Sequence, residues 1–191
     1  MPKRIFLIHG WDGSSEGDWI SWATEKFRQL GHTVIAPDMP HPEKPEIKEW
    51  VDYLKSIATS LDQNTYFIGH SIGCQTILRF LETQDIKIGG AIFVAGWFNL
   101  INLENAESET IAKPWIETPM NFEKIKNNLN RSILILGDND PWVPYEETKR
   151  DFETKLGAEA ITLHNVGHIT SDDGFGPLPK LVEIFQNHFA T

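Results

Sequence analysis

Cysteine and long apolar runs are nearly absent from this 191-residue sequence, and both shortages narrow the class of protein. Because Cys74 is the one cysteine, no disulfide can form within the chain, and nothing indicates an oxidising compartment. The apolar run from Ile5 to Ile8 is far shorter than the core of a secretion signal or a membrane-spanning helix. We therefore expect a cytoplasmic protein that does not associate with a membrane.

Basic residues are also scarce, with 17 Lys and Arg against 27 Asp and Glu and a formal net charge of −10. A surface of this charge repels both the phosphate backbone of nucleic acids and anionic membrane surfaces. We therefore expect a small-molecule substrate, with neither nucleic acid nor a membrane as a partner. The sequence says nothing direct about oligomeric state, and a monomer is the simplest expectation.

Motifs for metal ions and nucleotide cofactors are missing as well. The chain has no H-E-x-x-H pattern, no cysteine pair, no G-x-G-x-x-G pattern and no P-loop. We therefore expect a protein that uses no metal ion and no cofactor.

What the sequence does contain is an alternation of two kinds of segment. Short apolar, β-branched runs are separated by segments with helical periodicity, which is typical of βαβ units and of an α/β protein with a parallel sheet. The length fits a single domain over residues 1–191. The expected strands are 4–8, 33–36, 66–68, 91–95, 132–136 and 160–163, and the expected helices are 19–30, 47–61, 74–81, 145–156 and 179–189. The irregular segment 96–130 predicts a small cap-like insertion over one edge of the sheet.

Gly69-His70-Ser71-Ile72-Gly73 matches the pattern G-x-S-x-G directly between an expected strand and an expected helix. This setting is that of a nucleophile elbow, in which a strained turn exposes the serine at the C-terminal edge of the sheet. Small neighbours avoid a clash in so tight a turn, and the helix N-terminus favours developing negative charge. Ser71 is therefore the candidate nucleophile, and an ordinary helix-capping turn is the simpler alternative.

A serine hydroxyl needs a base, here a histidine, and the base needs a carboxylate to orient it. After such an elbow, the acid comes first along the chain and the histidine follows it. Asp138 and Asp140 come after the fifth expected strand, and His164 and His168 come after the sixth. Asp140 precedes a proline that holds its backbone extended, whereas Asp138 could form the turn instead. His168 follows a flexible glycine and is the preferred base, with His164 as its rival.

Backbone N–H groups must stabilise the tetrahedral intermediate in such a site. We expect one from Ile72, directly after the nucleophile, and one from Trp11, in a loop that Gly10 allows to approach closely. Cys74 lies one helical turn beyond Ser71. It is either a second candidate nucleophile or a small buried residue of the helix, and its position favours burial.

Trp11, Trp97 and Trp142 each lie close in sequence to one of the expected catalytic loops. Aromatic walls suit hydrophobic acyl or alcohol groups, so we expect Trp97 and Trp142, together with His9 and Gly10, to bind substrate. Core packing is the alternative for these tryptophans, and we expect it for at least one of them.

Taken together, these elements resemble the α/β-hydrolase superfamily. Nearly the whole chain is similar to the small serine hydrolases related to retinoblastoma-binding protein nine and the bacterial YdeN proteins, through His9-Gly10-Trp11, Trp19 with Trp22, Asp38-Met39-Pro40, Gly69 to Cys74, Asp173-Gly174-Phe175 and Leu178-Pro179. The resemblance implies a three-layer α/β sandwich with a six-stranded parallel sheet, little or no lid, and a triad of Ser71, Asp140 and His168. It does not extend to binding a pocket protein, because Cys74 lacks the leucine and glutamate of an L-x-C-x-E motif.

We therefore expect a serine hydrolase that cleaves small carboxylic esters, or amides, through an acyl-enzyme on Ser71. In this hypothesis His168 is the general base and Asp140 orients it. Two alternatives remain open: a non-catalytic binding protein on a hydrolase scaffold, and an acyltransferase whose acceptor is not water.

Overall fold

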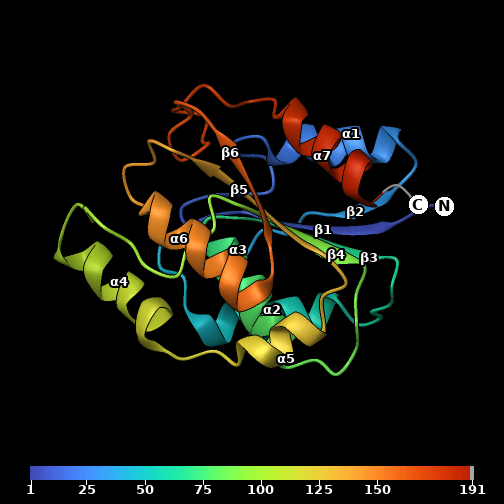
Figure 1. Ribbon diagram of the computed structural model, residues 1–191, viewed down its shortest axis with the longest axis horizontal. Helices are drawn as coiled ribbons and strands as arrows, with labels where there is room; N and C mark the ends of the chain where they lie inside the picture. Colours follow the sequence, from blue (N-terminus) through green and yellow to red (C-terminus); the bar gives the residue numbers. More distant parts are fainter. Residues whose placement is uncertain (190–191) are drawn as a thin grey trace.

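The computed structural model describes residues 1–189 and contains a six-stranded sheet in which every neighbouring pair of strands is parallel (Figure 1). The order of strands across the sheet is β2-β1-β3-β4-β5-β6. The strands are β1 (Arg4–Ile8), β2 (Thr33–Ile35), β3 (Thr65–His70), β4 (Gly90–Val94), β5 (Ser132–Gly137) and β6 (Glu159–Leu163). They confirm the strands expected from the sequence, with small shifts at the ends.

Helices cover both faces of the sheet, which confirms the three-layer α/β sandwich (Figure 1). One face carries α1 (Ile20–Gln29) and α7 (Pro179–Phe189). The other face carries α2 (Ile47–Ile57), α3 (Ile72–Glu82), α5 (Phe122–Asn127) and α6 (Tyr145–Asp151), which continues into a π-helical turn, η1 (Phe152–Leu156). Within residues 1–189, no helix is both long enough and apolar enough to cross a membrane.

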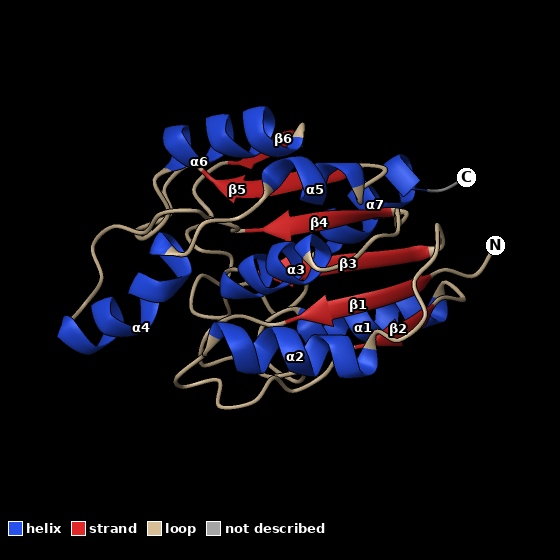
Figure 2. Ribbon diagram, turned by 90° about the horizontal axis from the view of Figure 1, so that it is seen from below, coloured by secondary structure: helices blue, strands red, loops and turns tan. Residues whose placement is uncertain are grey.

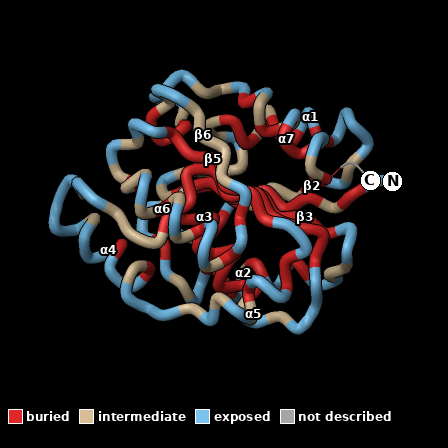
Figure 3. Tube along the Cα trace, in the orientation of Figure 1, coloured by how far each residue is buried: buried red, intermediate tan, exposed pale blue. Residues whose placement is uncertain are grey.

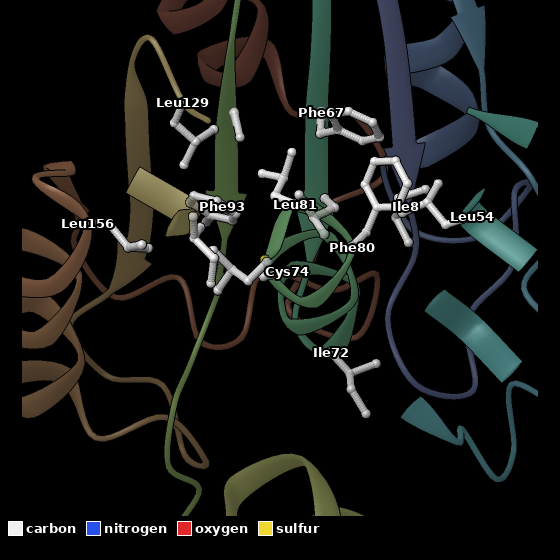
Figure 4. Close-up of a cluster of buried hydrophobic side chains, with 14 of the residues drawn as sticks. Ile8, Leu54, Phe67, Ile72, Cys74, Phe80, Leu81, Phe93, Leu129 and Leu156 are labelled. Carbon is white, nitrogen blue, oxygen red and sulfur yellow. The ribbon is translucent and has the colours of Figure 1, made fainter. Parts of the chain in front are cut away.

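Alternate side chains of each strand enter two separate hydrophobic cores, because successive residues of a strand point to opposite faces. In β1, Phe6 and Ile8 join the core on the α2 and α3 side, whereas Ile5 and Leu7 join the core on the α1 and α7 side. Figure 4 shows the first of these cores, with side chains of neighbouring strands packed against α3. The four central strands, β1, β3, β4 and β5, are consequently buried along nearly their whole length (Figure 3), which explains their almost continuous apolar sequences, whereas the edge strands β2 and β6 are only partly buried.

The crevice of the sheet lies between β1 and β3, where the strand order reverses. Ligands of open parallel sheets bind outside the C-terminal ends of the strands at such a switch point. These ends face the part of the molecule where α4 (Ala106–Glu117) lies (Figure 2). The loops that follow β1 and β3 are therefore placed to form a site.

Segment 96–130 contains two helices, α4 and α5, that the sequence analysis did not predict. The Asn105 side chain caps α4 and the Asn121 side chain caps α5, each accepting a hydrogen bond from the N–H three residues on. Pro114 inside α4 obscured the helical pattern, since proline normally ends a helix. Only α4 stands at the C-terminal edge of the sheet, because α5 packs in the helical layer beside α3 (Figure 2).

Candidate active site

Ser71 lies in the turn between β3 and α3, in a backbone conformation that non-glycine residues rarely adopt, with φ 51° and ψ −120°. A Cβ on Gly69 would lie 2.8 Å from the backbone nitrogen of Cys74, and a Cβ on Gly73 would lie 2.4 Å from the carbonyl oxygen of Ile8. Both contacts are with backbone atoms that cannot move aside cheaply. The turn therefore requires glycine on both sides of a strained serine.

Asp140 and His168 form a buried hydrogen-bonded pair. His168 Nδ1 lies 2.6 Å from Asp140 Oδ2, and the two side chains are only 9% and 0% exposed. The other oxygen, Oδ1, accepts hydrogen bonds from the backbone N–H groups of Trp142 and Val143, each at 3.0 Å. A carboxylate fixed through both oxygens can hold the Nδ1–H of the imidazole and leave Nε2 as the proton acceptor.

The two rival residues, Asp138 and His164, pair with each other instead. His164 Nδ1 lies 2.6 Å from Asp138 Oδ2, but the His164 side chain is 77% exposed. Hydrogen bonds from the backbone N–H of Asn165 and, second, from His164 lower the pKa of Asp138. Among the described residues, His168 lines the cavity at Ser71, whereas His164 and Asp138 do not.

A short side-chain ladder sets the register between the loops after β5 and β6. Asp138 Oδ1 accepts from the N–H of Asn165, and Asn139 Oδ1 accepts from the N–H of Gly167, each at 2.9 Å. The contact of Asp140 with His168 is the next step of this ladder. The two loops are therefore held together over several residues, which fixes where the imidazole lies.

His70 holds the backbone of His168 in place. Its Nε2–H donates to the His168 carbonyl oxygen at 3.0 Å, and the Trp19 ring packs edge-on against the His70 ring. Burial, with the charge of His168 second, lowers the pKa of His70 to about 4, so its ring is neutral at neutral pH. The His70 side chain therefore fixes the position of the His168 backbone through this hydrogen bond.

A cavity of about 370 Å³ opens over Ser71 and His168. Gly10 and Trp142 both line it, and the Trp142 ring stands edge-on to the His168 ring with 5.1 Å between centroids. Trp11 also lines the cavity. The expected aromatic wall therefore consists of Trp11 and Trp142.

Two residues expected to bind substrate, His9 and Trp97, are not among the described residues that line the cavity. His9 is 2% exposed, its Nδ1–H donates to the Gly10 carbonyl, and its Nε2 accepts from the backbone N–H of Met39. Trp97 is 1% exposed, and its indole Nε1–H donates to Ser71 Oγ at 3.3 Å. Both side chains are held in the interior by hydrogen bonds, which sequence proximity to a loop could not reveal.

The backbone N–H groups of Ile72 and Trp11 are free near Ser71. Ile72 is the first residue of α3, so its N–H has no partner within the helix. Trp11 follows Gly10, whose Cβ position lies 3.4 Å from the Cβ of Ser71. Within residues 1–189, neither group donates a hydrogen bond to the protein. Both can therefore serve an oxyanion at this place.

Cys74 is fully buried in α3, and burial raises the pKa of its thiol. The thiol also donates to the Val94 carbonyl oxygen at 3.5 Å. A buried, protonated thiol cannot act as a nucleophile, so the structure favours its role as a core residue.

Sequence reasoning missed several cavity residues. Leu100 and Leu103 precede α4 in a stretch without periodicity, and nothing in their pattern marked them. Asp18 lies shortly before α1, where an aspartate normally caps the helix, yet its Oδ1 accepts from the N–H of Ser171 at 2.7 Å. This contact joins the loop after β1 to the loop after His168, which only the folded chain could show.

A serine elbow after β3, an acid after β5 and a histidine after β6 on a parallel sheet define an α/β-hydrolase fold. The family described as serine hydrolase matches residues 5–187. The chain belongs to this serine hydrolase family, which confirms the class of enzyme expected from the sequence.

Comparisons with known proteins agree with this assignment. YdeN of Bacillus subtilis is 29% identical over 193 residues, which cover 100% of this chain and 98% of that protein. Its crystal structure matches this one with a TM-score of 0.90 and 28% identity, over 99% of this chain and 100% of that one. The serine hydrolase RBBP9 of Rattus norvegicus is 26% identical over 185 residues, or 95% of both chains. Est1E of Butyrivibrio proteoclasticus, at 18% identity, shares the fold with a TM-score of 0.72 over 100% of this chain and 89% of that one.

Proposed function

We propose that this serine hydrolase cleaves carboxylic esters, and amides of similar size, through an acyl-enzyme on Ser71. His168 removes the proton from Ser71 as the hydroxyl attacks, and Asp140 holds the imidazole and stabilises its charged form. The N–H groups of Trp11 and Ile72 bind the developing oxyanion. The observation that carries this proposal is the buried 2.6 Å pair of His168 and Asp140 beside the same cavity as a strained serine.

Short substrates suit the cavity better than long lipids. Its volume of about 370 Å³ is at the small end for ligand sites, and its walls include Trp11, Trp142, Leu100 and Leu103. We propose that α4 and the segment before it form the cap-like rim of the site rather than a lid. Est1E has been solved with ferulic acid bound, which makes small aromatic acyl groups sensible test substrates.

Hydrolysis of p-nitrophenyl acetate tests this proposal. Wild type should turn the ester over, and Ser71→Ala should lose at least about 10³-fold in kcat because the nucleophile is gone. Ser56→Ala is the matched control, since Ser56 is exposed on α2 and its hydroxyl bonds only to the nearby Tyr53 carbonyl. Equal turnover by wild type and Ser71→Ala, or no turnover by folded wild type across short esters, would contradict the proposal.

A further inference from the structure

Trp97 follows β4 at the carboxyl edge of the sheet and is fixed from two directions. Gln75, which is fully buried in α3, donates its Nε2–H to the Trp97 carbonyl oxygen at 2.7 Å. The preceding Ala95 has a φ of 48°, a conformation that turns the chain sharply after the strand. The indole ring is only 1% exposed. Its orientation is therefore set by the fold and not by solvent.

The indole Nε1–H of Trp97 points at the candidate nucleophile, Ser71 Oγ, at 3.3 Å. An indole nitrogen only donates, and a buried donor needs an acceptor. Within the described chain, its hydrogen-bond acceptor is this hydroxyl oxygen. The contact thus joins a fixed donor to Ser71 Oγ, the atom that forms and breaks the acyl bond in the proposed reaction.

This contact leaves the serine free to react. A hydroxyl has one hydrogen and two acceptor lone pairs. Trp97 occupies one lone pair, the hydrogen remains available to His168, and the second lone pair remains available for attack. The donor can therefore stay in contact with Oγ through both halves of a reaction cycle.

We propose that Trp97 is a catalytic donor that stabilises Ser71 Oγ as the leaving group when the acyl-enzyme is hydrolysed. This inference rests on the proposed function. In that step water attacks the acyl carbon while His168 takes its proton, and the tetrahedral intermediate then collapses. The C–Oγ bond breaks, its electron pair goes to Oγ, and His168 returns the proton to Oγ as the carboxylic acid departs.

The donor should favour this second half of the cycle over the first. In the free enzyme the acceptor is a hydroxyl oxygen, whereas in the acyl-enzyme it is an ester oxygen, which accepts hydrogen bonds less well. The Trp97 hydrogen bond therefore strengthens more between the acyl-enzyme and the charged transition state than between the free enzyme and its transition state. Only an interaction that is stronger in the transition state than in the ground state accelerates a step. Removing the N–H should slow deacylation more than acylation.

Trp97→Phe tests this by removing the N–H and keeping an aromatic ring. Rapid-mixing kinetics with p-nitrophenyl acetate resolve acylation as the burst and deacylation as the steady state, and intact-protein mass spectrometry measures the acetyl-enzyme. Deacylation should fall about tenfold or more, and acylation should change by less than about threefold. Acetyl-enzyme should then accumulate, and KM should fall together with kcat.

Trp115→Phe is the matched control, because Trp115 is also 1% exposed and its Nε1–H donates to the Pro45 carbonyl at 2.9 Å, away from Ser71. This variant should lose a similar buried hydrogen bond without changing the ratio of the two rates. Trp97→His, which retains a ring N–H, should recover part of the deacylation rate. Equal slowing of both steps in Trp97→Phe, or no change in either, would overturn the proposal.

A second measurement does not require Trp97→Phe to fold. In Ser71→Ala the acceptor oxygen is gone, so one of the seven indole N–H resonances should move upfield in NMR spectra and exchange faster with solvent. If no indole resonance responds, the contact is absent and the inference fails. If folded wild type forms no acyl-enzyme at all, the proposed function fails, and this inference fails with it.

Discussion

At the scale of single residues, the two aspartates of the loop after β5 have opposite surroundings. The Asp140 side chain is 0% exposed and fixed through both oxygens, whereas the Asp138 side chain is 32% exposed and bonds to an exposed histidine. Exposed ion pairs contribute little, because water screens them and both side chains stay mobile. Asp140 is thus the candidate for the catalytic role, whereas Asp138 holds the two loops together.

Substituting each aspartate by asparagine should separate these roles. Asp140→Asn should lower kcat by about 10³–10⁴-fold, because the amide favours the wrong tautomer of His168. Asp138→Asn should stay within about threefold of wild type, since the amide oxygen can still accept from the Asn165 N–H and only the exposed ion pair is lost. Steady-state kinetics on p-nitrophenyl acetate make the comparison, and a larger loss in Asp138→Asn than in Asp140→Asn would reverse the assignment.

His70 should make stability depend on pH. Its pKa is about 4 in the folded protein and 6.5 when unperturbed, so between these values the unfolded chain binds more protons. Stability should therefore fall as pH drops through this window, by up to roughly 1.4 kcal/mol per pH unit from this group. His70→Gln retains an N–H for the His168 carbonyl but cannot titrate, so its stability should fall less.

Urea unfolding of wild type and His70→Gln at about pH 7.5 and about pH 5 checks this expectation. The free energy of unfolding should drop more steeply in wild type. Parallel pH dependence in the two proteins would show that His70 does not carry the effect.

At the scale of elements, the elbow between β3 and α3 depends on close packing against β1. Gly73→Ala places a methyl group 2.4 Å from the Ile8 carbonyl oxygen, so the elbow must shift. We expect a loss of about 1–3 kcal/mol in the free energy of unfolding and a strong loss of activity. Gly176→Ala, with no atom within 4 Å of its Cβ position, should change stability by less than about 0.5 kcal/mol.

Chemical denaturation together with ester turnover distinguishes the two glycine variants. A Gly73→Ala protein with wild-type stability and wild-type activity would show that the elbow tolerates a side chain. The close approach of α3 to β1 would then not be needed for the site.

Periodicity and turn chemistry predicted these elements because their signals are local. The apolar strands and the pattern around Ser71 were sufficient to locate the candidate nucleophile, acid and base at the ends of β3, β5 and β6. The inward position of Trp97 and the link from Asp18 to Ser171 depend on packing between segments far apart in sequence. No local pattern contains that information, so only the folded structure could supply it.

At the scale of the whole molecule, charge should select among substrates. Among the described residues, the cavity is lined by four carboxylates, Asp12, Asp18, Glu104 and Asp172, and by no lysine or arginine. The protein as a whole has a net charge of −10. Such a field raises the local concentration of cations and repels anions. A short ester with a cationic alcohol group should therefore show a kcat/KM about tenfold or more above that of an anionic ester of similar shape.

Added salt provides the control for this prediction. The preference should shrink as ionic strength rises to about 0.5 M, because the Debye length falls well below the width of the site. A preference that does not change with salt would indicate shape or contact chemistry instead of charge.

Covalent labelling with a fluorophosphonate tests the central claim most directly, because Ser71 Oγ would attack phosphorus and expel fluoride without any assumption about the natural substrate. Intact-mass and peptide analysis should find one phosphonyl group per chain, attached to Ser71, in wild type. Ser71→Ala should remain unlabelled. Labelling at another residue, or none on folded wild-type protein, would contradict the assignment of Ser71 as the nucleophile.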